Sequence, residues 1–251
     1  MSVSMMEHAR TAVRGLLDLA LPTICVSCER QLSPRDRHLV CMGCWARLAA
    51  LPAPRCDRCG HPTYGRGCKF CELLPPFVRA VRSVCWVPHE VGSAVVSALK
   101  YHGWEAVAAG MAERMARLPW PADVVRERAA FVPVPLARSR EKERGFNQAW
   151  LLAVALGERC EVPAWNNLIS RERSTGTQTK LTPGERSANV HSAFAVPAAA
   201  KERVRGRHLV LVDDVITTGA TLNACADVLF AAGARTISYV TFGRARASGD
   251  R

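Results

Sequence analysis

The stretch from Leu209 to Leu222, LVLVDDVITTGATL, constrains the fold of this chain more than any other. Its first four residues are apolar and rich in β-branched side chains, which is typical of a strand buried on both faces of a parallel sheet. Two adjacent carboxylates, Asp213 and Asp214, follow this run. A helical pattern starts at about Leu222. Between the carboxylates and the helix lies a turn of small or hydroxyl-bearing residues: Thr217, Thr218, Gly219, Ala220 and Thr221.

A strand, a tight turn and a helix start form a geometry that binds phosphate. Free backbone N–H groups converge at the turn, and the helix dipole favours negative charge there. The turn lacks the Gly-Lys-Ser/Thr ending of a nucleotide triphosphatase loop, which excludes that class. Asp213 and Asp214 would repel a phosphate unless they faced another part of the ligand, and carboxylates accept hydrogen bonds well from sugar hydroxyls. The stretch therefore predicts a ribose 5-phosphate site, with a plain helix cap as the alternative.

The size and charge of the chain set broad limits on its class. It has 251 residues, of which 49% are apolar, so we expect one large or two smaller domains with a real core rather than a disordered chain. The formal net charge of +12 suits phosphate-bearing ligands and nucleic acid alike.

Eleven cysteines are many for this length, and eight of them fall in four C-x-x-C pairs before residue 72. The pairs are Cys25/Cys28, Cys41/Cys44, Cys56/Cys59 and Cys68/Cys71. Two such pairs close one tetrahedral site, so the eight sulfurs predict two Cys₄ zinc sites of structural type, with no open position for a substrate. Sequential pairing uses the shorter loops and is preferred, and interleaved pairing is the alternative.

Zinc binding would change both the charge and the expected compartment. Each zinc ion with four thiolates carries −2, so two sites would lower the formal net charge from +12 to +8. Thiolate sites together with the three remaining cysteines favour a reducing cytoplasm. The basic residues of this module either grip a nucleic-acid backbone or form a solvated surface.

We do not expect the N-terminal segment to be an export signal. Asp18 interrupts its apolar stretch, no small-residue cleavage site follows, and the stretch is too short to span a bilayer. Residues 13–20 instead predict a docking helix with one apolar face. A linker at residues 73–76 separates an N-terminal helix and double Cys₄ domain, residues 1–76, from a second domain, residues 77–251.

The second domain alternates strands with helices. The patterns predict strands at 81–87, 131–134, 209–212 and 236–242, and helices at 95–99 and 104–118. Pro135 ends the second strand. Arg244 to Arg251 are expected to fray. Residues 170–194 show little apolar periodicity and predict a functional loop, such as a lid that excludes water.

A basic segment follows Pro135 directly. Alone, it predicts a charged, solvated loop, but beside a ribose-phosphate signature it predicts a pyrophosphate site. Asn147 is expected to cap the helix that follows. The cations are Arg138, Arg140, Lys142 and Arg144.

VDDVITTGATL resembles the phosphoribosyl pyrophosphate (PRPP) signature of type I phosphoribosyltransferases. Three segments in order, PVPL with RxxxKxRGFNQ, TxxQxxLxxxxRxxN and VDDVITTGATL, together with the paired cysteines and the LKYHG segment, resemble the ComF family of competence-associated proteins over nearly the whole chain. The resemblance implies an α/β fold, a type I phosphoribosyltransferase-like parallel sheet flanked by helices, with a small N-terminal Cys-rich zinc domain. Some relatives carry a single Cys₄ site, so the resemblance implies one or two structural zinc ions.

The resemblance also divides the candidate residues by the part of PRPP that they would contact. Asp213 and Asp214 would hold the ribose 2- and 3-hydroxyls, and the turn from Thr217 to Thr221 would hold the 5-phosphate. Lys100 and Pro135 would contact PRPP as well.

The reaction implied is displacement of pyrophosphate from C1 of PRPP by a nucleophile that the sequence does not name. Arg138, Lys142 and Arg144 would neutralise the departing pyrophosphate, with Mg²⁺ bridging it to the ribose. Two alternatives keep the fold without this turnover. One is an accessory factor that binds single-stranded DNA with the competence machinery during DNA uptake, and the other is a PRPP sensor.

Overall fold

The computed structural model describes residues 23–246 except 34–35, 37, 64–67, 103–104 and 172–192. The predicted N-terminal docking helix and most of the predicted lid lie outside the described residues. The lid segment is flanked by a short antiparallel pair, β3 (Ser170–Arg171) with β4 (Phe194–Ala195).

The core is a parallel sheet of four strands in the order β1-β6-β5-β2. The strands are β1 (Val78–Val87), β2 (Arg128–Pro133), β5 (His208–Ile216) and β6 (Thr236–Ala245). All three neighbouring pairs run parallel. The predicted α/β class and the four predicted strands are therefore confirmed, each strand being longer than its apolar pattern alone suggested.

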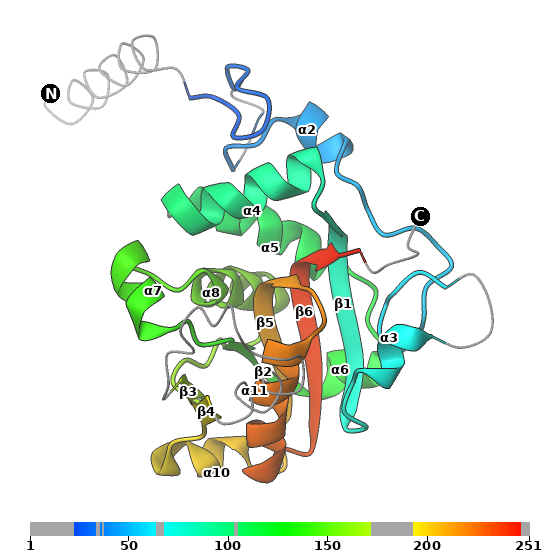
Figure 1. The fold of residues 1–251 in the computed structure, drawn as a ribbon, viewed down its shortest axis with the longest axis vertical. Helices are drawn as coiled ribbons and strands as arrows, with labels where there is room; N and C mark the ends of the chain where they lie inside the picture. Colours follow the sequence, from blue (N-terminus) through cyan, green and yellow to red (C-terminus); the bar gives the residue numbers. More distant parts are fainter. Residues whose placement is uncertain are drawn as a thin grey trace, which may run out of the picture.

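Helices cover both faces of the sheet (Figure 1). On one face lie α4 (Glu90–His102), α5 (Glu105–Ala116) and α8 (Gln148–Cys160). On the other lies α11 (Ala220–Ala231). β5 serves both layers, because alternate side chains of a strand point to opposite faces. Val210 and Val212 pack with the first group, whereas Leu209 and Leu211 pack with α11.

The shorter helices connect these layers. They are α6 (Ala122–Glu127) before β2, α7 (Arg138–Arg144) after it, and α10 (Lys201–Val204) with the 3₁₀ turn Ala198–Ala200 before β5. Two more, α2 (Met42–Ala46) and α3 (Lys69–Glu72), belong to the cysteine-rich segment.

The cysteine-rich segment wraps around the exposed edge of β1. The carbonyl of Ala49 accepts a hydrogen bond from the N–H of Trp86 at 2.8 Å, and that of Arg58 accepts one from Val81 at 2.8 Å. These bonds cover backbone groups that an edge strand would otherwise present to other chains. The first cysteine cluster packs with α4 and α5, and the second packs with the α11 face. The boundary at residue 76 stays a prediction, and hydrophobic contacts run across it.

Two expectations were wrong. The basic segment is not a loop but α7, which ends at Gly145 with a positive φ of 78°. Arg244 is not frayed but is a fully buried residue of β6. Its guanidinium donates to the carbonyl of Cys59 at 2.7 Å and stacks on the ring of Phe70, so the second cysteine cluster provides partners that local sequence cannot reveal.

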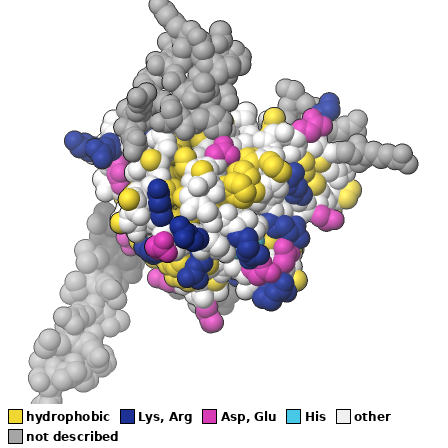
Figure 2. Space-filling view, turned by 90° about the horizontal axis from the view of Figure 1, so that it is seen from below, with side chains coloured by type: hydrophobic (Ala, Val, Ile, Leu, Met, Phe, Trp, Pro, Cys, Tyr) yellow, Lys and Arg dark blue, Asp and Glu magenta, His cyan; other side chains and the backbone are white. Residues whose placement is uncertain are grey.

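Lys and Arg side chains are spread over the face at which Figure 2 looks, in keeping with the formal net charge of +12. Within the described part of the chain, no helix combines the length and the apolar character needed to cross a membrane.

His208, at the start of β5, should make stability depend on pH. It is 2% exposed, its Nε2 lies 2.9 Å from Ser238 Oγ, and burial lowers its pKa from 6.5 to about 4. Between these values the unfolded chain binds a proton at His208 and the folded chain does not. Stability therefore falls as pH falls through this window, by about 2 kcal/mol between about pH 7 and about pH 5.

Urea unfolding of the His208→Gln variant at these two pH values should show a weaker pH dependence than the unchanged chain. The same substitution at the half-buried His89 serves as the control for general effects, including metal loss at low pH. An identical pH dependence with and without His208 would contradict the assignment.

Candidate functional site

The candidate site lies at the edge of the sheet where the parallel strands end, which is where open α/β sheets bind ligands. The ends of β2 and β5 are adjacent, because the N–H of Val134 donates to the carbonyl of Val212 at 3.0 Å. Pro135, just after β2, therefore lies near Asp213 and Asp214, which come just after the apolar run of β5. Two of the predicted segments meet here.

Asp214 lies at the centre of a polar network. It continues the alternation of Val210 and Val212, so its side chain points to the face covered by α4 and α8. It is 4% exposed. Lys100, near the end of α4, places its ammonium nitrogen 2.5 Å from Oδ2 of Asp214. Gln148, the first residue of α8, donates from Nε2 to Oδ1 at 3.5 Å.

Arg144 joins this network from α7. Its Nη1 donates to Oε1 of Gln148 at 3.0 Å. Its guanidinium also lies over the ring of Tyr101, with 5.4 Å to the centroid. Tyr101 follows Lys100 in α4, so these side-chain contacts link three segments of the sequence and begin and end at neighbouring residues of one helix. Three predicted residues, Lys100, Arg144 and Asp214, are thus brought together.

Asp213 has a different environment. It points to the opposite face from Asp214 and stays partly exposed, and its Oδ1 accepts the N–H of Asp214 at 2.8 Å. The surrounding protein and the neighbouring carboxylate of Asp214 raise the pKa of Asp213 well above its usual range. Asp213 is the carboxylate that a ligand can reach with less rearrangement.

The turn after β5 has the predicted strand-turn-helix geometry. Gly219 adopts a φ of 84° at the N-cap of α11, a conformation that side-chain-bearing residues rarely adopt. Thr218 Oγ1 accepts the N–H of Ala220 at 3.4 Å. Thr217, Thr218 and Ala220 are exposed, and Thr221 is half-buried. The start of this helix therefore faces solvent beside Asp213.

Arg138 and Lys142 lie on the exposed surface of α7. The contacts that link Lys100, Asp214, Gln148 and Arg144 do not include them. Arg138 and Pro135 instead line a cavity of about 580 Å³ beside β2, together with Asn147 and Arg171. Asn147 caps α8 as predicted, since its Oδ1 accepts the N–H of Ala149 at 2.9 Å.

Another cavity, of about 470 Å³, lies between the second cysteine cluster and β1. Its wall includes Arg82, whose guanidinium donates to the backbone carbonyls of Pro119 and Asp57. These bonds join the cysteine-rich segment to the sheet, so we assign Arg82 a structural role.

The eight paired cysteines form two clusters, and the preferred sequential pairing is confirmed. Cys25, Cys28, Cys41 and Cys44 form the first, and Cys56, Cys59, Cys68 and Cys71 form the second. In each, the four sulfurs lie within 4.8 Å of one another. Tetrahedral coordination with zinc–sulfur bonds of about 2.3 Å requires sulfurs about 3.8 Å apart.

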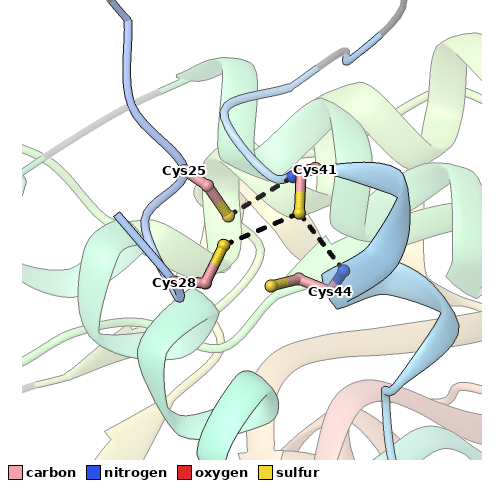
Figure 3. A group of neighbouring side chains, drawn as sticks. All are labelled: Cys25, Cys28, Cys41 and Cys44. Atoms are coloured by element: carbon pink, nitrogen blue, oxygen red, sulfur yellow. Dashed lines mark hydrogen bonds between the residues drawn. The ribbon is translucent and has the colours of Figure 1, made fainter. Parts of the chain in front are cut away.

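The sulfur geometry fits this requirement. In the first cluster the sulfurs of Cys28 and Cys41 are 3.8 Å apart (Figure 3). The N–H of Cys41 points to the sulfur of Cys25 at 3.4 Å, and that of Cys44 to the sulfur of Cys41 at 3.3 Å, which favours thiolates. In the second cluster the sulfurs of Cys56 and Cys71 are 3.4 Å apart, so a metal would need to widen it slightly. Both clusters are suited to structural zinc.

Sequence reasoning missed two residues of the site. Gln148 was part of the RGFNQ segment and Tyr101 part of LKYHG, but neither had a role. The available signal was their position beside the cations Arg144 and Lys100, which places them at the same edge of the sheet.

Metal analysis should find two zinc ions per chain. Cys44→Ser and Cys59→Ser should each remove one ion and lower the unfolding temperature, because both cysteines are fully buried in the hydrophobic clusters of the core. Cys160→Ser on α8, outside both cysteine clusters, should leave two ions. A single zinc ion in the unchanged chain would contradict the assignment of the second site.

Comparison with known proteins agrees with this organisation. Residues 16–74 match the double zinc ribbon domain family, and residues 160–251 match the phosphoribosyl transferase domain family. A similarity to the solved structure of glutamine PRPP amidotransferase from B. subtilis, complexed with ADP and GMP, has a TM-score of 0.40 and 16% identity. It covers 58% of this chain and 30% of that one, and carries no weight for function.

Full-length relatives match more closely. The chain is 31% identical over 236 residues to Competence protein F of Haemophilus influenzae, covering 89% of this chain and 96% of that protein. It is 32% identical over 234 residues to DNA utilization protein YhgH of Salmonella typhi, covering 87% and 96%. It is 27% identical over 240 residues to Competence protein ComFC of Bacillus subtilis, covering 87% and 93%. The chain therefore belongs to the ComF family, in which a double zinc ribbon is joined to a phosphoribosyltransferase domain.

Proposed function

We propose that this chain binds PRPP with Mg²⁺ at the edge where β2 and β5 end, and transfers the phosphoribosyl group to an acceptor. The observation that supports this most is the chain of side-chain contacts from Lys100 through Asp214 and Gln148 to Arg144. It joins a carboxylate at the end of β5 to cations from two other segments, Lys100 and Arg144. A ligand with a sugar at one end and a pyrophosphate at the other matches that distribution of charge.

The sugar phosphate would bind at the end of β5. The turn from Thr217 to Thr221 would hold the 5-phosphate with backbone N–H groups and hydroxyls. Asp213 and Asp214 would accept the ribose hydroxyls. Asp214 already accepts bonds from Lys100 and Gln148, but each carboxylate oxygen can accept more than one bond. Asp213 is partly exposed and is not bonded to Lys100 or Gln148, so it would contact the ligand first.

The pyrophosphate would lie toward α7. Arg144 would contact it from within the network, and Arg138 and Lys142 from the exposed side of the helix, with Pro135 and Lys100 lining the approach. Mg²⁺ would supply positive charge that offsets the charge of the pyrophosphate, and it would need few protein ligands. The nucleophile forms a bond to C1 while the bond from C1 to the pyrophosphate oxygen breaks, and the cations stabilise the leaving group's charge.

The names of the relatives, Competence protein and DNA utilization protein, support a role of this activity in DNA uptake. The eleven thiols, eight of them in the two zinc clusters, support a reducing cytoplasm as its location. A single-stranded-DNA-binding accessory factor is the second candidate, which the formal net charge of +12 favours. Release of pyrophosphate in a screen of nucleobases, amines and nucleic acids would distinguish an enzyme from this factor and from a PRPP sensor.

Calorimetry with PRPP and Mg²⁺ tests the binding site. Asp213→Asn should lower PRPP affinity at least about ten-fold, because it replaces one carboxylate oxygen by an NH₂ group that cannot accept a bond from a ribose hydroxyl, while sparing the ion pair of Lys100 with Asp214. The control is Glu202→Gln, which removes an exposed carboxylate on α10. Equal affinity of the unchanged chain and the Asp213→Asn variant would refute the proposed sugar contact.

A further inference from the structure

We infer that Gln148 is a positioning residue that ties the pyrophosphate side of the proposed site to its sugar side. The inference rests on the proposed function. One side-chain amide contacts both the Arg144 guanidinium and the Asp214 carboxylate, at 3.0 Å and 3.5 Å. Gln148 itself need not touch the ligand, since it is 6% exposed and acts through these two neighbours.

The backbone at Gln148 is held in place by contacts that do not involve its side chain. Asn147, one residue earlier, caps α8 through the N–H of Ala149 and donates from Nδ2 to the carbonyl of Val134 at 3.1 Å. Val134 is in turn bonded to β5 through the carbonyl of Val212. The start of α8 is therefore anchored to the same strand ends that carry the carboxylates, which leaves the Gln148 side chain little freedom.

The chemistry of the side chain matches this place. A primary amide offers an acceptor oxygen and a donor nitrogen at one end, so it can bind a cation and an anion at once. A glutamate would accept from Arg144 but repel Asp214, and a lysine would do the reverse. An apolar residue of similar length would fill the space and contact neither charge.

The two neighbours do not depend on Gln148 equally. Asp214 keeps a second partner in Lys100, at 2.5 Å. Arg144 is half-buried at the end of α7, and besides Gln148 it contacts the face of the exposed Tyr101 ring. Loss of the amide would therefore leave the carboxylate largely in place and release the guanidinium. Because preorganised charge binds more strongly than mobile charge, the pyrophosphate half of the ligand should be affected more than the sugar half.

This asymmetry gives a test, because a purely structural role of Gln148 would not predict different effects on the two halves of the ligand. Calorimetry with Mg²⁺ should compare PRPP with ribose 5-phosphate, which lacks the pyrophosphate. In Gln148→Met, affinity for PRPP should fall about ten-fold or more, the effect of losing a hydrogen bond to a charged group. Affinity for ribose 5-phosphate should change less than about two-fold. The same substitution at the exposed Gln31 should change neither.

A double-mutant cycle tests whether Gln148 acts through Arg144. Arg144→Met should lower PRPP affinity strongly in the unchanged chain and add little in the Gln148→Met background, because the arginine has already lost its fixed position. Should thermal unfolding show that Gln148→Met does not fold, Gln148→Asn keeps the amide and shortens its reach, and the same loss of PRPP affinity is expected.

The outcomes separate this inference from the proposed function. PRPP binding by the unchanged chain, with equal losses for both ligands or no loss in the Gln148 variants, would overturn the inference alone. Fully additive effects of Gln148→Met and Arg144→Met would also overturn it. No binding of PRPP to the unchanged chain would overturn the proposed function and this inference with it.

Discussion

The burial of β5 on both faces is the constraint on which the rest of the structure depends. Its backbone pairs with β6 on one side and β2 on the other, and its alternate side chains pack into opposite layers of the core. Where β5 pairs with both neighbours, from His208 to Val212, its residues after His208 are all apolar, as burial on both faces requires. Asp213 and Asp214 follow directly after the last residue that pairs with β2, and the helices and turns after the other strands bring the remaining polar segments to that same edge.

The alternation of β5 continues into the two carboxylates and gives them different neighbours. Asp214 points to the layer of α4 and α8, so Lys100 and Gln148 can reach it, whereas Asp213 points toward α11 and the small-residue turn. One carboxylate is therefore held by the protein and the other is presented near the start of a helix. Asp213 and Asp214 therefore have different environments because successive side chains of a strand point to opposite faces.

The sequence predicted what local pattern determines. The apolar run, the turn with Gly219 and the α11 start were found, as was the sequential pairing of the cysteines, because loop length and residue type suffice for these. The helical state of α7 was not predicted, since its charges suggested solvation and its length is set by Gly145. Burial of Arg244 depends on Cys59, which is 185 positions away. The residues at the site were identified except Gln148 and Tyr101, and the roles assigned to them stay predictions, because no pattern shows which ones touch a ligand.

The charge around the two carboxylates explains why a ligand with a cation would suit this site. Lys100 balances Asp214, but Asp213 has a neighbouring carboxylate and surrounding protein that raise its pKa. A phosphate without a cation would add negative charge beside Asp213 and would not offset the charge of the two carboxylates. In the proposed function, a pyrophosphate bound with Mg²⁺ would bring positive charge near the sugar, which would favour the ionised form of Asp213 and strengthen its bonds to ribose hydroxyls. In the proposed function, Asp213 rather than the turn would therefore favour a phosphosugar that carries a metal ion over a simple phosphate.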